Sequence, residues 1–118
     1  MTNPTTDSKM YQTMHRQPEV LRQLLAGPGW AAAEEAAGML AGAHRVFLVG
    51  IGTSYHAALV GAWLLRTAGL DARAISSFDF AVYPDQFPIS ADDAVVILAH
   101  TGVKHYSATS LERAASAG

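Results

Sequence analysis

Two short segments of this 118-residue chain place small and hydroxyl-bearing residues directly after apolar runs. They are Gly50-Ile51-Gly52-Thr53-Ser54 and Ala99-His100-Thr101-Gly102-Val103-Lys104. Glycine lets the backbone approach an anion closely, Thr and Ser hydroxyl groups donate hydrogen bonds, and lysine supplies a full positive charge. The two segments therefore indicate a site for a phosphate group.

Each segment also has an ordinary interpretation. Ser54 could simply cap the helix that follows it, which serine does routinely. The second segment could be a strand-to-helix loop with a solvated lysine. The first segment is neither a dinucleotide fingerprint, because Tyr55 stands where the third glycine would fall, nor a Walker loop, because no Gly-Lys-Ser/Thr follows. The residue types alone leave these alternatives open.

The elements that must position these segments follow from the apolar pattern. One helix is predicted to open at Gln17-Pro18-Glu19, and further helices to cover residues 30–41, 54–68 and 106–117. Strands are predicted over 45–50, 72–77 and 94–99, and the nearly continuous apolar run of the first predicts burial on both of its faces. Residues 78–93 are aromatic, contain proline and are predicted to be irregular. Strands that alternate with helices predict an α/β fold, a three-layer α-β-α sandwich with a parallel sheet. Ligands bind such sheets outside the carboxyl ends of the strands, where both segments lie.

The helix over 54–68 is apolar almost all round, which predicts that it packs against the sheet and against something else, such as a partner subunit. Three strands make a thin sheet, and the sequence stops where a fourth strand would be expected. We therefore expect a chain truncated after the third strand and its helix, or a unit whose partner completes its core.

Composition excludes several classes of function. Half of the residues are apolar, the charged fraction is 15% and the formal net charge is −2, so neither wholesale disorder nor a nucleic-acid partner is expected. The absence of cysteine excludes a disulfide scaffold and a cysteine nucleophile. The spacing of His100 and His105 fits no zinc pattern, and no metal is expected. No apolar run is long enough to span a membrane, and the start lacks a signal-peptide pattern, so the cytoplasm is the expected compartment.

The run from Val46 to Gly61, with Gly52-Thr53-Ser54-Tyr55 at its centre, resembles the first motif of the SIS (sugar isomerase) domain family. It is most similar to the isomerase half of the glucosamine-6-phosphate synthases. Gln17-Pro18-Glu19 resembles the helical entry to that domain, and Ser77-Phe78-Asp79-Phe80 resembles the S-E-F that follows its second strand. The resemblance implies an SIS-type fold over residues 10–118. Residues 1–9, which are rich in Thr, Asn, Pro and Ser, are predicted to be disordered.

The resemblance also implies roles for single residues. Thr53 and Ser54 would bind the phosphate of a sugar, beside Gly52. The family's second motif is S-x-S-G-x-T. In this chain Thr101 stands for its second serine and Gly102 matches its glycine, whereas Ala99 lacks the first hydroxyl group and Lys104 replaces the last threonine. We infer that Lys104 offsets the lost hydroxyl contacts with its charge, and His100 is expected to line the pocket.

The family's catalytic base, ring-opening histidine and lysine have no counterpart in this chain, so no catalytic residue is assigned. The resemblance implies the substrate-binding part of an aldose–ketose isomerase, an aminotransferase-type isomerase or a deglycase, without a cofactor. The altered second motif leaves open a module that senses a sugar phosphate without turnover. A homodimer or a second SIS domain is the expected partner.

Overall fold

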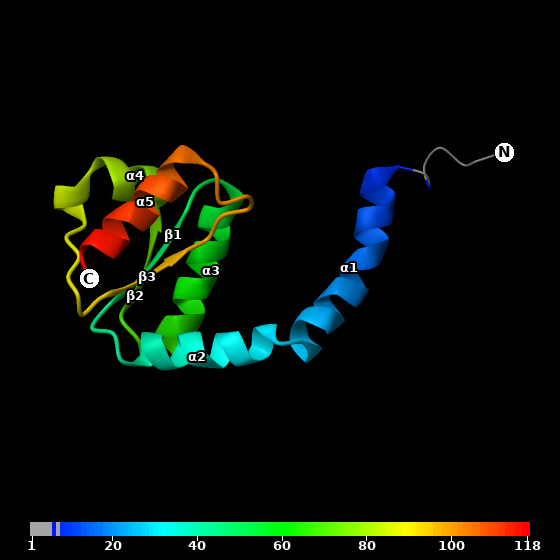
Figure 1. The fold of residues 1–118 in the computed structure, drawn as a ribbon, viewed down its shortest axis with the longest axis horizontal. Coiled ribbons are helices and arrows are strands. Elements are labelled where there is room, and N and C mark those ends of the chain that lie inside the picture. Colours follow the sequence, from blue (N-terminus) through cyan, green and yellow to red (C-terminus); the bar gives the residue numbers. More distant parts are fainter. Residues whose placement is uncertain (1–5, 7) are drawn as a thin grey trace. The chain divides into compact units, whose positions relative to one another are not determined.

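The computed structural model describes residue 6 and residues 8–118, so most of the start that was predicted to be disordered lies outside the described residues. The chain divides into two compact units, Met1–Gly38 and Met39–Gly118. The first holds helix α1 (Lys9–Ala26) and most of helix α2 (Gly29–Ala41). The second holds the parallel sheet (Figure 1).

Helix α1 begins earlier than the sequence predicted. The Ser8 side chain accepts a hydrogen bond from the Tyr11 amide at 3.1 Å, so Ser8 is the N-cap and satisfies one of the amides that a helix start leaves unpaired. Pro18 lies inside the helix. The prediction that the helix opens at Pro18 was wrong, because a good cap upstream outweighs one missing backbone donor. No residue of α1 is buried.

The second unit alternates strands and helices as predicted. Its elements are β1 (Val46–Gly50), α3 (Thr53–Thr67), β2 (Ala72–Ser76), α4 (Ser77–Val82), the 3-10 helix η1 (Pro84–Gln86), β3 (Ala94–Ile97) and α5 (His105–Ser116). The strands form one parallel sheet in the order β2-β1-β3, with Val46 opposite both Ala72 and Ala94. The chain therefore crosses from one side of β1 to the other between β2 and β3.

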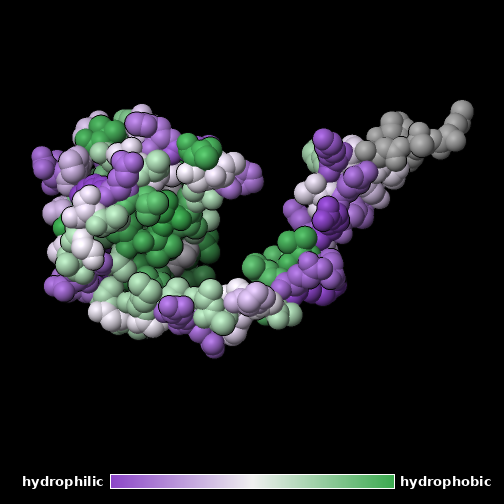
Figure 2. Space-filling view, in the orientation of Figure 1, coloured by the Kyte–Doolittle hydropathy of each residue, from purple (hydrophilic) through white to green (hydrophobic). Residues whose placement is uncertain are grey.

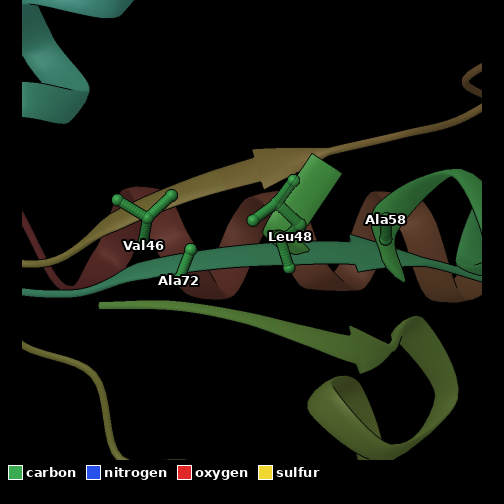
Figure 3. Packing of buried hydrophobic residues seen from close by; sticks show 5 residues of the cluster. Val46, Leu48, Ala58 and Ala72 are labelled. Carbon is green, nitrogen blue, oxygen red and sulfur yellow. The ribbon is translucent and has the colours of Figure 1, made fainter. Parts of the chain in front are cut away.

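Strand β1 is buried on both faces, as its apolar run predicted. On one face Val46 and Leu48 pack against α3 (Figure 3). On the other, Phe47 and Val49 pack with Phe80 of α4. Side chains alternate across a strand, so β1 supplies both cores. The sheet is thus covered by helices on two faces, which confirms the three-layer α-β-α fold.

The segment predicted to be irregular is partly helical, because it contains α4 and η1. Arg113 of α5 holds it in place. The Arg113 guanidinium donates hydrogen bonds to the carbonyl oxygens of Phe80 at 2.7 Å and Pro84 at 3.0 Å, and to that of Phe87. It also lies over the Phe80 ring, 4.2 Å from the centroid. These contacts come from a helix distant in sequence, which local patterns do not reveal.

A bidentate ion pair joins the starts of β1 and β3. Arg45 Nε and Nη2 lie 2.9 and 2.7 Å from the carboxylate oxygens of Asp93, whose side chain is fully buried. The Ser90 amide and hydroxyl also donate to Asp93, so Asp93 closes the turn before β3. The Arg45 hydrogen bonds, helped by those from Ser90, hold the pKa of Asp93 far below its ordinary value despite the opposing effect of burial.

Candidate functional site

The carboxyl end of β1 runs directly into the first turn of α3. A Cβ atom on Gly50 would lie 2.6 Å from the carbonyl carbon and oxygen of Ser54 and 2.9 Å from the Tyr55 amide nitrogen. Gly52 has a positive φ of 61°, a conformation that other residues rarely adopt. The two glycines therefore serve different purposes: Gly50 permits close packing, and Gly52 permits the turn.

Gly52, and not Ser54, is the N-cap of α3. Thr53 and Ser54 are the first two residues of the helix, so the alternative in which Ser54 merely caps it is wrong. In the part of the chain that the structure describes, neither hydroxyl group has a hydrogen-bond partner, nor does the Thr53 amide. Three donors at the start of one helix are thus available to an external group.

The second segment follows β3, the neighbour of β1. Pairing continues one residue past β3, since the Leu98 amide donates to the Val49 carbonyl at 2.8 Å. The chain then turns through Gly102, whose φ is 72°, and enters α5, with Lys104 as the N-cap. The side chains of His100, Thr101 and Lys104 are exposed. Because β1 and β3 are parallel neighbours, both segments emerge at the same edge of the sheet.

A shallow open pocket of about 480 Å³ lies between the two segments. Its walls come from α3 and from the end of β3 and the residues after it, and its lining residues are Thr53, Ser54, Ala57, Ile97, Leu98, Ala99 and His100. None of them is acidic. The pocket therefore combines hydroxyl donors on one side with an imidazole on the other, above an apolar floor.

The structure brings some of the predicted site residues together and leaves others aside. Thr53, Ser54 and His100 line the pocket. Thr101 and Lys104 belong to the same loop as His100 but do not line the pocket. Gly102 lines a different hollow, of about 460 Å³, between β3 and α5. Figure 2 shows hydrophobic side chains gathered over β3. This strand is the outermost of the sheet on its side and is only half-buried.

The sequence analysis missed the apolar part of the pocket. Ala57, Ile97 and Leu98 line this part of the pocket. Ala99 lines it as well, although the sequence drew attention to Ala99 only because it lacks the hydroxyl group of the family motif. Their place was open to prediction, because Ala57 lies one helical turn after Thr53 and the others end the strand that carries the second loop.

The electrostatic setting of the pocket favours an anion. Helices α3 and α5 both begin at this edge of the sheet, and the start of a helix carries unpaired amides and the positive end of the dipole. The ion pairs Arg45–Asp93 and Arg73–Asp71 lie at the opposite edge, where β1, β3 and β2 begin. The carboxylates of Asp93 and Asp71 thus lie at the end of the sheet opposite the pocket.

Residue 6 and residues 8–118 contain neither a metal-binding cluster nor a membrane-spanning helix. Within that range, no three His, Cys, Asp or Glu side chains are grouped closely enough to hold a metal ion. No helix there combines the length and the apolar character needed to cross a bilayer.

Comparison with known proteins identifies the family. The SIS domain model matches residues 39–118. The chain is 33% identical over 93 residues to the glutamine–fructose-6-phosphate aminotransferase (isomerizing) of Pyrobaculum aerophilum, and 34% identical over 98 residues to that of Aeropyrum pernix. Each match covers 79% of this chain, and the chain spans about 15% of the length of each relative. No solved structure gave a significant match. The chain belongs to the SIS domain family.

Proposed function

We propose that this chain binds the phosphate group of a phosphorylated sugar or sugar amine between the start of α3 and the loop after β3. The observation that carries the proposal is a set of donors at the start of α3 that have no partner among the described residues: the Thr53 and Ser54 hydroxyl groups and the Thr53 amide. A phosphate oxygen accepts hydrogen bonds from such donors and is favoured by the helix dipole. The relatives, which are named for fructose 6-phosphate, support a sugar as the rest of the ligand.

Gly52, Thr101, Gly102 and Lys104 complete the proposed site in different ways. Gly52 shapes the turn that presents the Thr53 amide, and Gly102 shapes the second loop. Thr101 and Lys104 stand at exposed positions of that loop. Lys104 acts in the proposal as a charge that attracts the phosphate, with His100 closer to the sugar.

The proposed role is the substrate-binding part of an aldose–ketose isomerase, an aminotransferase-type isomerase or a deglycase. In such a reaction the bound phosphate orients the sugar, so that a base can move a proton between adjacent carbons. No residue of this chain is proposed as that base. A second SIS domain or a second copy of this chain is proposed as the partner, and the cytoplasm as the compartment.

The proposed domain extends from residue 10 to residue 118. The match to the Pyrobaculum protein includes 93 residues of this chain, more than residues 39–118 can supply. It therefore takes in the whole of α2 and residues before it, which supports a module larger than the family model alone.

Isothermal titration calorimetry tests the proposal with fructose 6-phosphate, glucosamine 6-phosphate, the two unphosphorylated sugars and inorganic phosphate. We expect both sugar phosphates to bind, inorganic phosphate to bind more weakly, and the free sugars to bind least, because the phosphate is the anchor. Equal heats from fructose and fructose 6-phosphate would contradict the phosphate site.

The second candidate is a sensing module that binds a sugar phosphate without turnover. It is favoured by the loop after β3, where Ala99 and Lys104 replace two hydroxyl residues of the family motif. Nuclear magnetic resonance of ¹³C-labelled fructose 6-phosphate with the chain separates the two roles. Conversion of the labelled sugar to another sugar phosphate indicates catalysis, whereas binding without conversion indicates sensing.

A further inference from the structure

A second pocket, of about 320 Å³, lies at the edge of the sheet where β1 and β2 begin, opposite the proposed phosphate site. Two arginines, Arg45 and Arg73, form one part of its wall. Phe47, Ile75 and Phe87 form an apolar part. Its volume is at the lower end of the range that ligand pockets occupy, about 300–1,000 Å³. The pocket therefore offers fixed cations and an apolar surface to a small molecule.

Arg45 is held in place by three different contacts. Its Nε and Nη2 atoms lie 2.9 and 2.7 Å from the carboxylate oxygens of Asp93. Nη2 also donates to the Pro88 carbonyl oxygen at 3.1 Å, and the guanidinium carbon lies 5.2 Å from the centroid of the Phe47 ring. Only 21% of the Arg45 side chain is exposed. A ligand that binds this guanidinium group meets a fixed donor, so little side-chain entropy is lost on binding.

Arg73 belongs to the same face of the sheet. It lies opposite Phe47 in the parallel register, and side chains alternate across a strand, so Arg45, Phe47 and Arg73 share one face. Asp71 accepts hydrogen bonds from Arg73 Nε and Nη2 at 2.9 and 2.8 Å. Both arginines thus use the same two nitrogens for their ion pairs. Across residue 6 and residues 8–118, the Nη1 atom of neither arginine has a hydrogen-bond partner, and each remains a donor for a further acceptor.

We propose that this pocket binds a small organic acid, with its carboxylate on the two Nη1 atoms and its apolar body against Phe47 and Phe87. Guanidinium groups present planar N–H donors that match the two oxygens of a carboxylate. The two arginines and their aspartate partners have charges that sum to zero. The pocket therefore has no excess positive charge to balance a phosphate dianion, and a monoanion is favoured.

Nuclear magnetic resonance of the intact ¹⁵N-labelled chain with benzoate tests the site. We expect benzoate, at about millimolar concentration, to shift the backbone amide signals of residues 73–75 and 86–87 and to leave those of residues 52–54 in place. Benzamide has the ring without the charge, acetate has the carboxylate without the ring, and inorganic phosphate has neither. Each of the three should bind at least about tenfold more weakly in this pocket, because each lacks one of the two kinds of contact.

Arg73→Met removes one guanidinium group and keeps an apolar side chain in its place. It should weaken benzoate binding about tenfold, the loss of one charge-assisted hydrogen bond. Arg22→Met is the matched control, because Arg22 forms a similarly exposed ion pair with Glu19 on α1, and it should leave benzoate binding unchanged. Arg45 is a poor choice for replacement, since its loss would leave a buried carboxylate unpaired.

Gln86→Glu supplies a second variant that does not disturb the ion pairs. Gln86 is an exposed residue of η1 that lines the pocket, and a negative charge there should repel benzoate and weaken its binding. Unchanged benzoate affinity in both Arg73→Met and Gln86→Glu, equal affinities for benzoate and benzamide, or no shift in the pocket at about 10 mM benzoate would each overturn the proposal. Shifts confined to residues 52–54 would also overturn it, because benzoate would then occupy only the phosphate site.

The inference does not rest on the proposed sugar-phosphate site, which lies at the other end of the strands. Ser54→Ala should therefore leave benzoate binding unchanged, and fructose 6-phosphate should not displace benzoate. If benzoate fails to bind while fructose 6-phosphate binds, only the acid site is overturned. Displacement of benzoate from the pocket by fructose 6-phosphate would overturn the separation of the two sites.

Discussion

Replacing Gly50 by alanine should destabilise the second unit and weaken ligand binding together. The added Cβ atom would lie 2.6 Å from the carbonyl carbon and oxygen of Ser54 and 2.9 Å from the Tyr55 nitrogen. All three are backbone atoms of the first turn of α3, so no side chain can swing aside. Either β1 or the start of α3 must move, and the start of α3 holds the Thr53 and Ser54 donors.

The expected size of the effect follows from the kind of contact. Forcing an extra methyl group into a packed region costs about 1–3 kcal/mol, and a backbone obstacle on a central strand places Gly50→Ala near the upper end, at about 3 kcal/mol. Urea denaturation followed by circular dichroism measures this loss in the free energy of unfolding. Gly38→Ala is the control, because a Cβ atom there meets nothing within 4 Å, and it should be neutral or slightly stabilising.

Calorimetry with glucosamine 6-phosphate on the same variant supplies the second result. We expect Gly50→Ala to weaken binding even under conditions in which the chain remains folded, because the donors at the start of α3 are displaced. If the free energy of unfolding of Gly50→Ala lies within about 0.5 kcal/mol of the wild-type value, a difference typical of a surface substitution, the close packing of β1 on α3 would be refuted.

Three further predictions concern single side chains. Ser54→Ala should weaken binding of glucosamine 6-phosphate about fivefold, the equivalent of about 1 kcal/mol for one hydrogen bond, while Ser116→Ala, which removes a hydroxyl bonded within α5, should change nothing; unchanged affinity in Ser54→Ala by calorimetry would count against the pocket. Lys104→Met should weaken binding of glucosamine 6-phosphate at low salt and reduce the dependence of the affinity on salt, whereas Lys104→Arg should keep the wild-type affinity and salt dependence. Equal affinities of the wild type and both variants at low salt would show that Lys104 does not act on the phosphate. The lowered pKa of Asp93 means that its contribution to stability is present above the unfolded-state pKa of about 3.9 and is lost as the pH falls below it. Asp93→Asn should therefore show a smaller decline in melting temperature from neutral to acidic pH than the wild type, and parallel declines would contradict the ion pair.

The sequence was sufficient for the parts of the fold that local pattern controls. The apolar run of β1 predicted a strand buried on both faces, and both cores are built on it. The alternation of strands and helices predicted a parallel sheet. The order β2-β1-β3 could not be predicted in the same way, because neighbours in the sheet that are distant in sequence leave no local periodicity.

The errors came from interactions between distant residues or from competing signals. Helix α4 depends on Phe80 in the core and on Arg113 from α5, neither of which the aromatic and proline content of residues 78–93 reveals. Pro18 was taken as a helix start because proline is common there, but the Ser8 cap lay further upstream. At the site, the residues at the start of α3 and the end of β3 could be placed from the sequence, whereas the course of the loop after β3 could not. Lys104 and His100 share this loop, yet only His100 lines the pocket.

The strand order also explains why two separate sequence segments can act on one ligand. Because β3 lies beside β1 and parallel to it, the turn before α3 and the loop before α5 leave the sheet at the same edge. Helix α3 packs on one core, and α5 packs beside α4, which belongs to the other. A phosphate bound by both segments would therefore connect the two cores. Since a ligand that binds only the folded state raises its stability, the melting temperature of the second unit should rise with sugar-phosphate concentration, and less in Ser54→Ala.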